Sequence, residues 1–253
     1  TSVGYLLESK DETVTPNIID RYRGEGGVNT AFLAFGFKLF NKIGVGLTTN
    51  YEFGNLNHIT TRFLEDIELA TRLESNSSLS GFNYTYSLLF REKISKRLTL
   101  HATYISSQKY DLVSTNTQTL STYSLSNQYG GDQEEIDLGT MNLDKTEITV
   151  PKFQTLGLGI GVDTKWFVGA EYKIVEGGGL NNKLFNLENV DFKKGSKFSL
   201  GGFYIPKFDS FTSFFSRLVY RGGFRVENTG LYIDDQSINC LLYTSDAADD
   251  SDC

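Results

Sequence analysis

The chain has 253 residues, 39% of them hydrophobic and 13% aromatic, with 25 Gly, 3 Pro and a net charge of −7. This composition indicates one ordered domain, and it argues against nucleic-acid binding because a phosphate-binding surface needs clustered Lys and Arg. The most apolar run, Ala31 to Phe40, is interrupted by Gly36 and Lys38, and no run approaches the roughly 18 apolar residues of a spanning helix. A helical membrane protein is therefore excluded, whereas a membrane β-barrel is compatible with the slightly negative mean hydropathy.

The two ends of the sequence give little information about fold. The first residue is Thr1 and the only methionine is Met141, so no translation start or signal peptide can be identified. Cys240 and Cys253 are the only cysteines, which leaves the rest of the chain without a disulfide framework or a thiolate metal site. From Cys240 the alternation stops and a small, acidic string begins. We therefore assign residues 1–239 to one domain and treat residues 240–253 as an artefactual tail, with a disordered acidic tail as the alternative.

The first strong signal is a pair of alternating segments, which follows a weak strand at residues 3–7. In residues 30–39 and 43–54 the apolar side chains occupy odd positions and the small or polar ones occupy even positions, a period of two that predicts strands. A three-residue loop, Phe40 to Lys42, keeps the two apolar faces together because it pairs Leu39 with Ile43, whereas a two-residue turn would mix the faces. We adopt the register that the three-residue loop gives.

Later segments repeat this pattern with the apolar face on even positions. They form a hairpin at residues 82–104, a hairpin at residues 156–174 around the turn 163–165, and a last pair at residues 198–204 and 218–226. The even positions that we expect to face lipid in these segments are Phe82, Tyr84, Tyr86, Leu88, Phe90, Leu98, Leu100, Ala102, Tyr104, Leu156, Leu158, Ile160, Val162, Trp166, Val168, Ala170, Tyr172, Ile174, Phe198, Leu200, Gly202, Tyr204, Leu218, Tyr220, Gly222, Phe224 and Val226.

Short and long connections alternate along the chain. The long polar connections are residues 11–27, 55–78, 106–149 and 176–194, and short turns join the strands between them. Outer-membrane barrels have short periplasmic turns and long external loops, a regularity that soluble β-sandwiches do not require. The sequence thus predicts an all-β, antiparallel transmembrane β-barrel in the outer membrane of a Gram-negative bacterium. The segments above make nine strands, and a tenth is expected to start near Tyr232. Because single-chain bacterial barrels have even strand numbers and must close, we expect these strands to be an incomplete part of a barrel.

Three strings resemble the FadL-type family of outer-membrane transporters for long-chain fatty acids and other hydrophobic compounds. They are "GGVNTAFLAFGFKLFNKIGVGLTTNYEFGNL" from Gly26, "LGLGIGVDTKWFVGAEY" from Leu156, and the run from Leu200 to Asn239 that contains "GGFYIP", "YRGGF" and "GLYI". The resemblance implies a fourteen-stranded barrel with an N-terminal plug and a lateral exit for the substrate. The plug would precede Thr1, so no ligand-binding residue of that family is carried over.

Charged residues on the predicted inward face are the candidate ligand-binding residues. Arg217, Arg221 and Arg225 are expected on one strand, and Glu171 and Lys173 on another. Guanidinium groups bind carboxylates in a bidentate fashion, so these residues form either a track for a fatty-acid carboxylate or a salt-bridge network inside the barrel.

No catalytic or metal site is predicted. His58 and His101 have no second ligand at metal-binding spacing, no nucleophile elbow is present, and the glycine runs lack a phosphate-loop lysine. We therefore expect a protein that is not an enzyme and has no cofactor.

The leading hypothesis is passive transport of hydrophobic small molecules, with such a molecule and outer-membrane lipid as the partners. The alternative is a structural or secretion-associated barrel that binds protein partners, for which the long connection at residues 106–149 is suitable.

Overall fold

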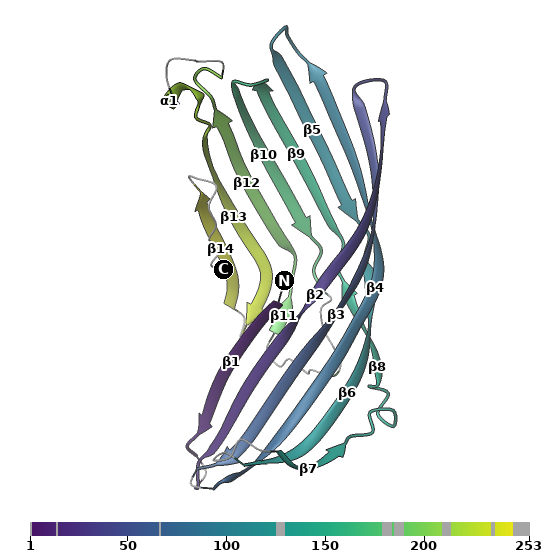
Figure 1. Cartoon of the computed structure of the whole chain (residues 1–253), viewed down its shortest axis with the longest axis vertical. Coiled ribbons are helices and arrows are strands. Elements are labelled where there is room, and N and C mark those ends of the chain that lie inside the picture. Colours follow the sequence, from purple (N-terminus) through teal and green to yellow (C-terminus); the bar gives the residue numbers. More distant parts are fainter. Residues whose placement is uncertain are drawn as a thin grey trace.

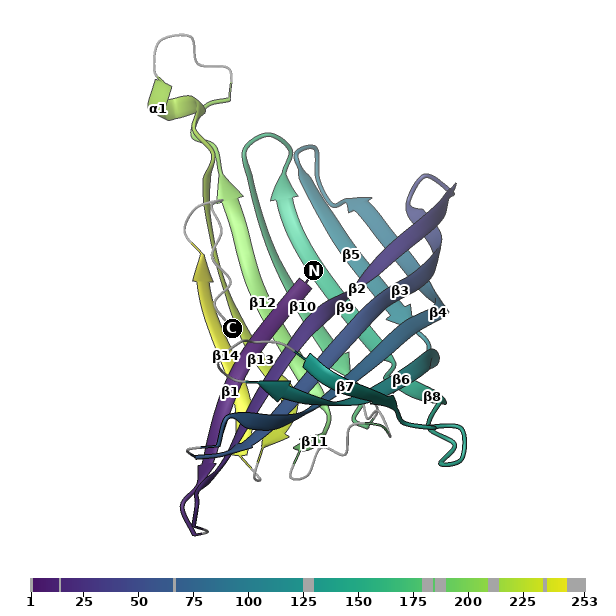
Figure 2. The same ribbon diagram turned by 60° about the horizontal axis from the view of Figure 1, so that its bottom comes forward.

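The computed structural model describes residues 2–13, 15–65, 67–124, 130–178, 184, 190–208, 214–233 and 236–244. In this part of the chain the strands form one antiparallel sheet that is strongly curled (Figures 1 and 2). Along the main path of this sheet the strands are β1 (Ser2–Asp11), β2 (Ile18–Leu39), β3 (Ile43–Leu64), β4 (Leu69–Lys93), β5 (Leu98–Ser107), β9 (Phe153–Val162), β10 (Trp166–Val175), β12 (Gly195–Tyr204) and β13 (Tyr220–Ile233).

The remaining elements extend this path. Both β11 (Val190–Phe192) and β14 (Gln236–Thr244) pair with β13, and β6 (Tyr110–Ser124) pairs with one end of β4. Two short strands, β7 (Gly130–Glu135) and β8 (Lys145–Val150), pair with β6. A four-residue helix, α1 (Phe214–Arg217), precedes β13. Among the described residues no helix is long and apolar enough to span a membrane.

The curl separates the two faces of the sheet. On β9 the even residues Leu156 and Leu158 are 59% and 64% exposed on the convex face, whereas Thr155 on the concave face is 5% exposed. Curvature brings side chains on the inner face together and spreads those on the outer face, as in a barrel wall. The predicted apolar outer face and the antiparallel barrel-type fold are therefore confirmed, while the inner face combines small and polar residues with some large apolar ones, such as Phe167 and Phe203.

The hairpin registers are those that keep the apolar odd or even positions of paired strands on the same face. The structure pairs Leu39 with Ile43 and Leu33 with Thr49, as the three-residue loop predicts. Val162 pairs with Trp166 in the next hairpin, and Gly202 pairs with Gly222 in the last one. A one-residue slip would place every apolar side chain on the concave face, so burial of one face fixes the register.

The predicted long polar loops are wrong over much of their length. β2 and β3 have 22 residues each and β4 has 25, and they include most of residues 18–27 and 55–78. A tilted strand crosses a bilayer in about 9–11 residues. The ten residues of β5, β9, β10 and β12 match that length, whereas β2, β3 and β4 extend about twice as far. We call the extension, together with β6, β7 and β8, the distal sheet; it forms the lower part of Figure 1.

The distal sheet has a small core of its own on the concave side. Leu79, Leu112 and Ile148 are buried, and Val28, Leu56, Tyr110 and Val150 pack against them. Beside this core lies the buried amide of Asn116. Its Oδ1 accepts hydrogen bonds from the hydroxyls of Ser77 and Ser114 at 2.7 Å, and its Nδ2 donates to the carbonyl of Leu143 at 2.8 Å and to Thr146 Oγ1 at 3.0 Å.

Within the described residues the sheet remains open, since β1 pairs only with β2 and β14 pairs only with β13. Strand β14 continues to Thr244, five residues beyond the predicted domain boundary at residue 239. Residues 245–253, the rest of the predicted tail, lie outside the described residues.

Candidate functional site

A row of glycines crosses the concave face of the sheet. Gly159 on β9 pairs with Gly169 on β10, Gly169 with Gly201 on β12, and Gly201 with Gly223 on β13. His101 on β5 continues the row, since it pairs with Gly159. Four neighbouring strands thus lack a side chain at the same level. Glycines in a strand interior mark places where a ligand, a ring or another chain approaches the backbone closely.

The ring of Phe167 covers one end of this glycine row. A Cβ atom at Gly159 would lie 2.3 Å from the Phe167 ring, and one at Gly169 would lie 2.9 Å from it. The ring meets His101 edge-on at a centroid distance of 5.7 Å and stacks on Phe203 at 6.2 Å. Because aromatic rings compensate for missing side chains beside strand glycines, Phe167 stabilises this part of the wall.

A hollow of about 470 Å³ lies over the glycine row and includes the Phe167 ring in its lining. A Cβ atom at Gly201 would have only ordinary contacts, the nearest at 3.5 Å. The hollow offers aromatic surface, with one carboxylate and one guanidinium at its edge. The residues that line it are His101, Thr103, Gly157, Leu158, Gly159, Phe167, Gly169, Ala170, Glu171, Ser199, Gly201, Gly202, Phe203 and Arg221.

The five predicted ligand-binding residues are dispersed in the structure. Arg221 and Glu171 line the hollow. Arg225 makes an ion pair with Glu227 at 3.5 Å, and the ammonium of Lys173 lies 4.3 Å from the centre of the Phe153 ring. Arg217 belongs to α1, because β13 begins only at Tyr220 and not at Leu218 as predicted.

The inward carboxylate of Glu52 is satisfied by neutral donors. Asn83 Nδ2 donates to it at 2.8 Å and the Tyr110 hydroxyl donates at 2.9 Å, while Asn50 Nδ2 donates to Asn83 Oδ1 at 2.7 Å. The alternation predicts Asn50 only as one of the even, polar positions of residues 43–54, and Tyr110 falls in the predicted long connection at residues 106–149. Burial alternates along residues 110–124, where Leu112, Ser114 and Asn116 are buried, but the residue types do not alternate, so the sequence gives no local signal for the strand that pairs with β4.

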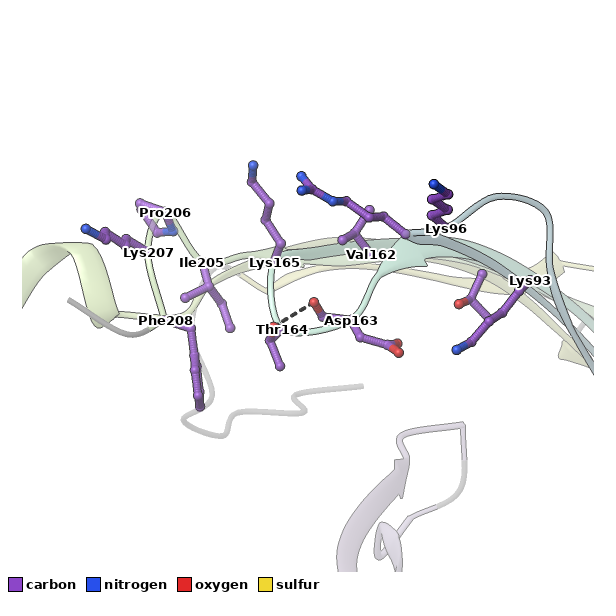
Figure 3. Close-up of a pocket in the computed structure, with 12 residues that line it drawn as sticks. Lys93, Lys96, Val162, Asp163, Thr164, Lys165, Ile205, Pro206, Lys207 and Phe208 are labelled. Carbon is purple, nitrogen blue, oxygen red and sulfur yellow. Dashed lines mark hydrogen bonds between the residues drawn. The ribbon is translucent and has the colours of Figure 1, made fainter.

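A second hollow, of about 590 Å³, lies at the short-turn end of the sheet (Figure 3). Among the described residues, five basic side chains line it, and the one acidic side chain, Asp163, makes an ion pair with Arg91 at 3.4 Å. The described residues that line it are Lys93, Lys96, Arg97, Thr99, Val162, Asp163, Thr164, Lys165, Ile205, Pro206, Lys207 and Phe208. Sequence reasoning missed this surface because its basic residues come from three turns. They could have been found from one shared feature, because each of them lies at or beside a connection predicted to be short.

Neither hollow contains a recognisable catalytic arrangement, and the described residues include no group of three or more His, Cys, Asp or Glu that could hold a metal ion. The curled antiparallel sheet, its apolar convex face and its membrane-length strands define an outer-membrane protein of the β-barrel type. The protein is located in the outer membrane of a Gram-negative bacterium.

The family model described as BamG matches residues 1–244, and the chain therefore belongs to the BamG family. This is a family of components of the BAM complex. One solved structure is similar: the "RagAB peptide transporter", with 10% sequence identity and a TM-score of 0.38, over 93% of this chain and 27% of that chain. No curated protein matches the chain.

The family assignment corrects the expected resemblance to FadL-type transporters. Fatty-acid transport and a hydrophobic small-molecule ligand were the wrong expectations, and the alternative of a structural barrel with protein partners is the one supported. The misleading strings were rich in glycine and aromatic residues. Such strings recur because curved walls of barrels need small residues inside and apolar rings outside, whatever the barrel does.

Proposed function

We propose that this protein is a structural component of the outer membrane that associates with the BAM complex through protein contacts and has no catalytic role. The observation that carries the proposal is the family match, which extends over residues 1–244 and thus includes both the membrane strands and the distal sheet. A family signal confined to a few barrel strands would support a shared fold alone.

The geometry supports a role in binding proteins. The distal sheet has its own buried core and a fully hydrogen-bonded Asn116, so it presents an ordered surface beyond the length that crosses a bilayer. The predicted ligand residues are dispersed, and two of them are engaged with Glu227 and Phe153. A conduit for amphipathic ligands needs a few polar groups that converge on one ligand, and these five do not converge.

The test is co-purification of the tagged full-length protein from its own outer membrane in a mild detergent. We expect BAM-complex subunits to be recovered by mass spectrometry, whereas an unrelated outer-membrane barrel with the same tag and abundance recovers none. Photo-crosslinking residues at the exposed positions Phe82, Leu158 and Phe198, on three different strands, then locate the contact. Failure of both co-purification and crosslinking to any BAM subunit would refute the proposal.

A further inference from the structure

Three aromatic side chains form a row on the convex face at the short-turn end. Trp166 on β10 pairs with Tyr204 on β12, and Tyr204 pairs with Tyr220 on β13. The two tyrosines are about half exposed. Trp and Tyr concentrate where membrane hydrocarbon meets the headgroups, because their rings are apolar and their N–H or O–H groups are polar. The row therefore marks the level of the headgroups on this side of the membrane.

Basic side chains lie immediately beyond this row. Lys165 precedes Trp166 in the β9–β10 turn, Lys207 follows Tyr204 by three residues, and Lys96 and Arg97 lie in the β4–β5 turn. All four line the second hollow, at the short-turn end of the sheet. Among the salt bridges of the described part of the chain, none involves any of the four. The whole chain carries a net charge of −7, so this positive excess is local.

Figure 3 shows on which side of the sheet these groups lie. Lys96 and Lys165 extend to one side, and Asp163 and Phe208 extend to the other. The purple ribbon of the β2–β3 hairpin faces the side of Asp163 and Phe208, which is thus the concave side. Lys96 and Lys165 consequently lie on the convex side, where lipid surrounds an outer-membrane sheet. A partner protein in the periplasm would approach the ends of the turns, whereas headgroups approach from the convex side.

We propose that Lys96, Arg97, Lys165 and Lys207, together with the Trp166–Tyr204–Tyr220 row, bind the phosphate groups of anionic phospholipids in the leaflet at the short-turn end. Long basic side chains near the ends of membrane segments reach the headgroups while their alkyl stems stay against apolar surface. The aromatic row fixes the depth of the sheet and holds the four cations at the phosphate level. This inference does not depend on the contact with the BAM complex.

The experiment compares lipid retention by the full-length protein and a four-site variant, Lys96→Gln, Arg97→Gln, Lys165→Gln and Lys207→Gln. Both are purified from membranes and placed in nanodiscs of phosphatidylethanolamine with one-fifth cardiolipin. The protein is then extracted from the nanodiscs into detergent and washed. The cardiolipin that stays bound to it is measured by mass spectrometry. Because a basic residue close to an anionic surface contributes about fivefold to binding, we expect at least about a tenfold loss of retained cardiolipin in the variant.

The control variant removes four exposed basic residues elsewhere in the sheet, through Lys10→Gln, Arg23→Gln, Lys109→Gln and Lys145→Gln. It has the same change in net charge and should retain cardiolipin as the unmodified protein does. A Lys-to-Arg variant at residues 96, 165 and 207 should also retain it. Equal loss in the control variant, or unchanged retention in the four-site variant, would overturn the proposal. Crosslinking of Lys165 to an acidic protein, without any effect of the substitutions on lipid retention, would assign the surface to a protein partner instead.

Discussion

Leu47 and Thr48 are adjacent on β3, and their side chains lie on opposite faces of the sheet. Leu47 is exposed on the convex face, and Thr48 lies on the concave face opposite Thr85. A charged residue in contact with hydrocarbon near the bilayer midplane costs about 2–4 kcal/mol, whereas the concave face accepts polar groups. Leu47→Arg should therefore lower the unfolding free energy in lipid bilayers by that amount, and Thr48→Arg should have a small effect. Equal unfolding free energies for the two variants would reverse the assignment of faces.

Asn116 is the residue on which the buried polar contacts of the distal sheet depend. Its amide uses both donors and accepts twice, so Asn116→Ala leaves the hydroxyls of Ser77 and Ser114 and the carbonyl of Leu143 without this partner. A buried polar group that loses its hydrogen bond costs about 1–3 kcal/mol. We expect a loss of that size at least, with local opening of β6 detected by hydrogen exchange. Exposed Asn142→Gly, at the nearby turn where φ is 55°, should leave exchange in β6 unchanged, because glycine adopts this conformation readily.

At the level of elements, the sequence predicted the four strand pairs between residues 30 and 226 whose outer faces are apolar. It missed the polar strands, and it assigned the last residues of β14 to the tail. The alternation of apolar residues was enough to pair Leu39 with Ile43 and Val162 with Trp166, because only one register keeps all the apolar side chains on one face. The distal halves of β3 and β4 carry polar residues on both faces, so they give no such signal. Their strands are stabilised by backbone pairing with neighbours distant in sequence, such as Asn76 with Thr117. A local pattern does not contain that information.

The candidate residues show the same limit. Parity placed Arg221 and Glu171 on the concave side, and both line the hollow there. It placed Arg217 on the same strand as Arg221, which is wrong, because a short run of mixed residues does not distinguish a strand from one helical turn. The glycine row was visible only as single glycines in four segments, since its continuity across β9, β10, β12 and β13 depends on all three registers together.

Gly202 and Gly222 provide a matched test of the strand packing, because they are paired neighbours on the convex face. A Cβ atom at Gly202 would lie 2.4 Å from the backbone oxygen of Phe167, whereas one at Gly222 would meet nothing within 4 Å. Gly202→Ala therefore requires a backbone shift and should cost about 1–3 kcal/mol. Gly222→Ala should be neutral or stabilising by up to about 1 kcal/mol, since it restricts the unfolded chain. Urea titration in bilayers, followed by Trp166 fluorescence, compares the two variants. Equal midpoints would contradict the close approach of β12 to β10 at Phe167.

At the level of the whole molecule, the two ends of the curled sheet differ in length, charge and packing, and these differences determine its orientation in the membrane. The short turns carry the basic residues and the aromatic row, while the distal sheet carries the buried core around Leu112. Short turns of outer-membrane barrels face the periplasm. The distal sheet should thus be outside the cell, and Ser95, in the β4–β5 turn, should be in the periplasm.

Cysteine accessibility tests this orientation on intact cells. Met141, in the turn before β8, and Ser95 are both exposed, so Met141→Cys and Ser95→Cys place a reactive thiol at opposite ends of the sheet. A maleimide on a polymer too large to cross the outer membrane should label Met141→Cys in intact cells, and should label Ser95→Cys only after the outer membrane is permeabilised. The unmodified chain, which already contains Cys240 and Cys253, sets the background. If Ser95→Cys is labelled in intact cells and Met141→Cys is protected, the orientation is the opposite one. The basic residues Lys96, Arg97, Lys165 and Lys207 would then lie at the outer leaflet.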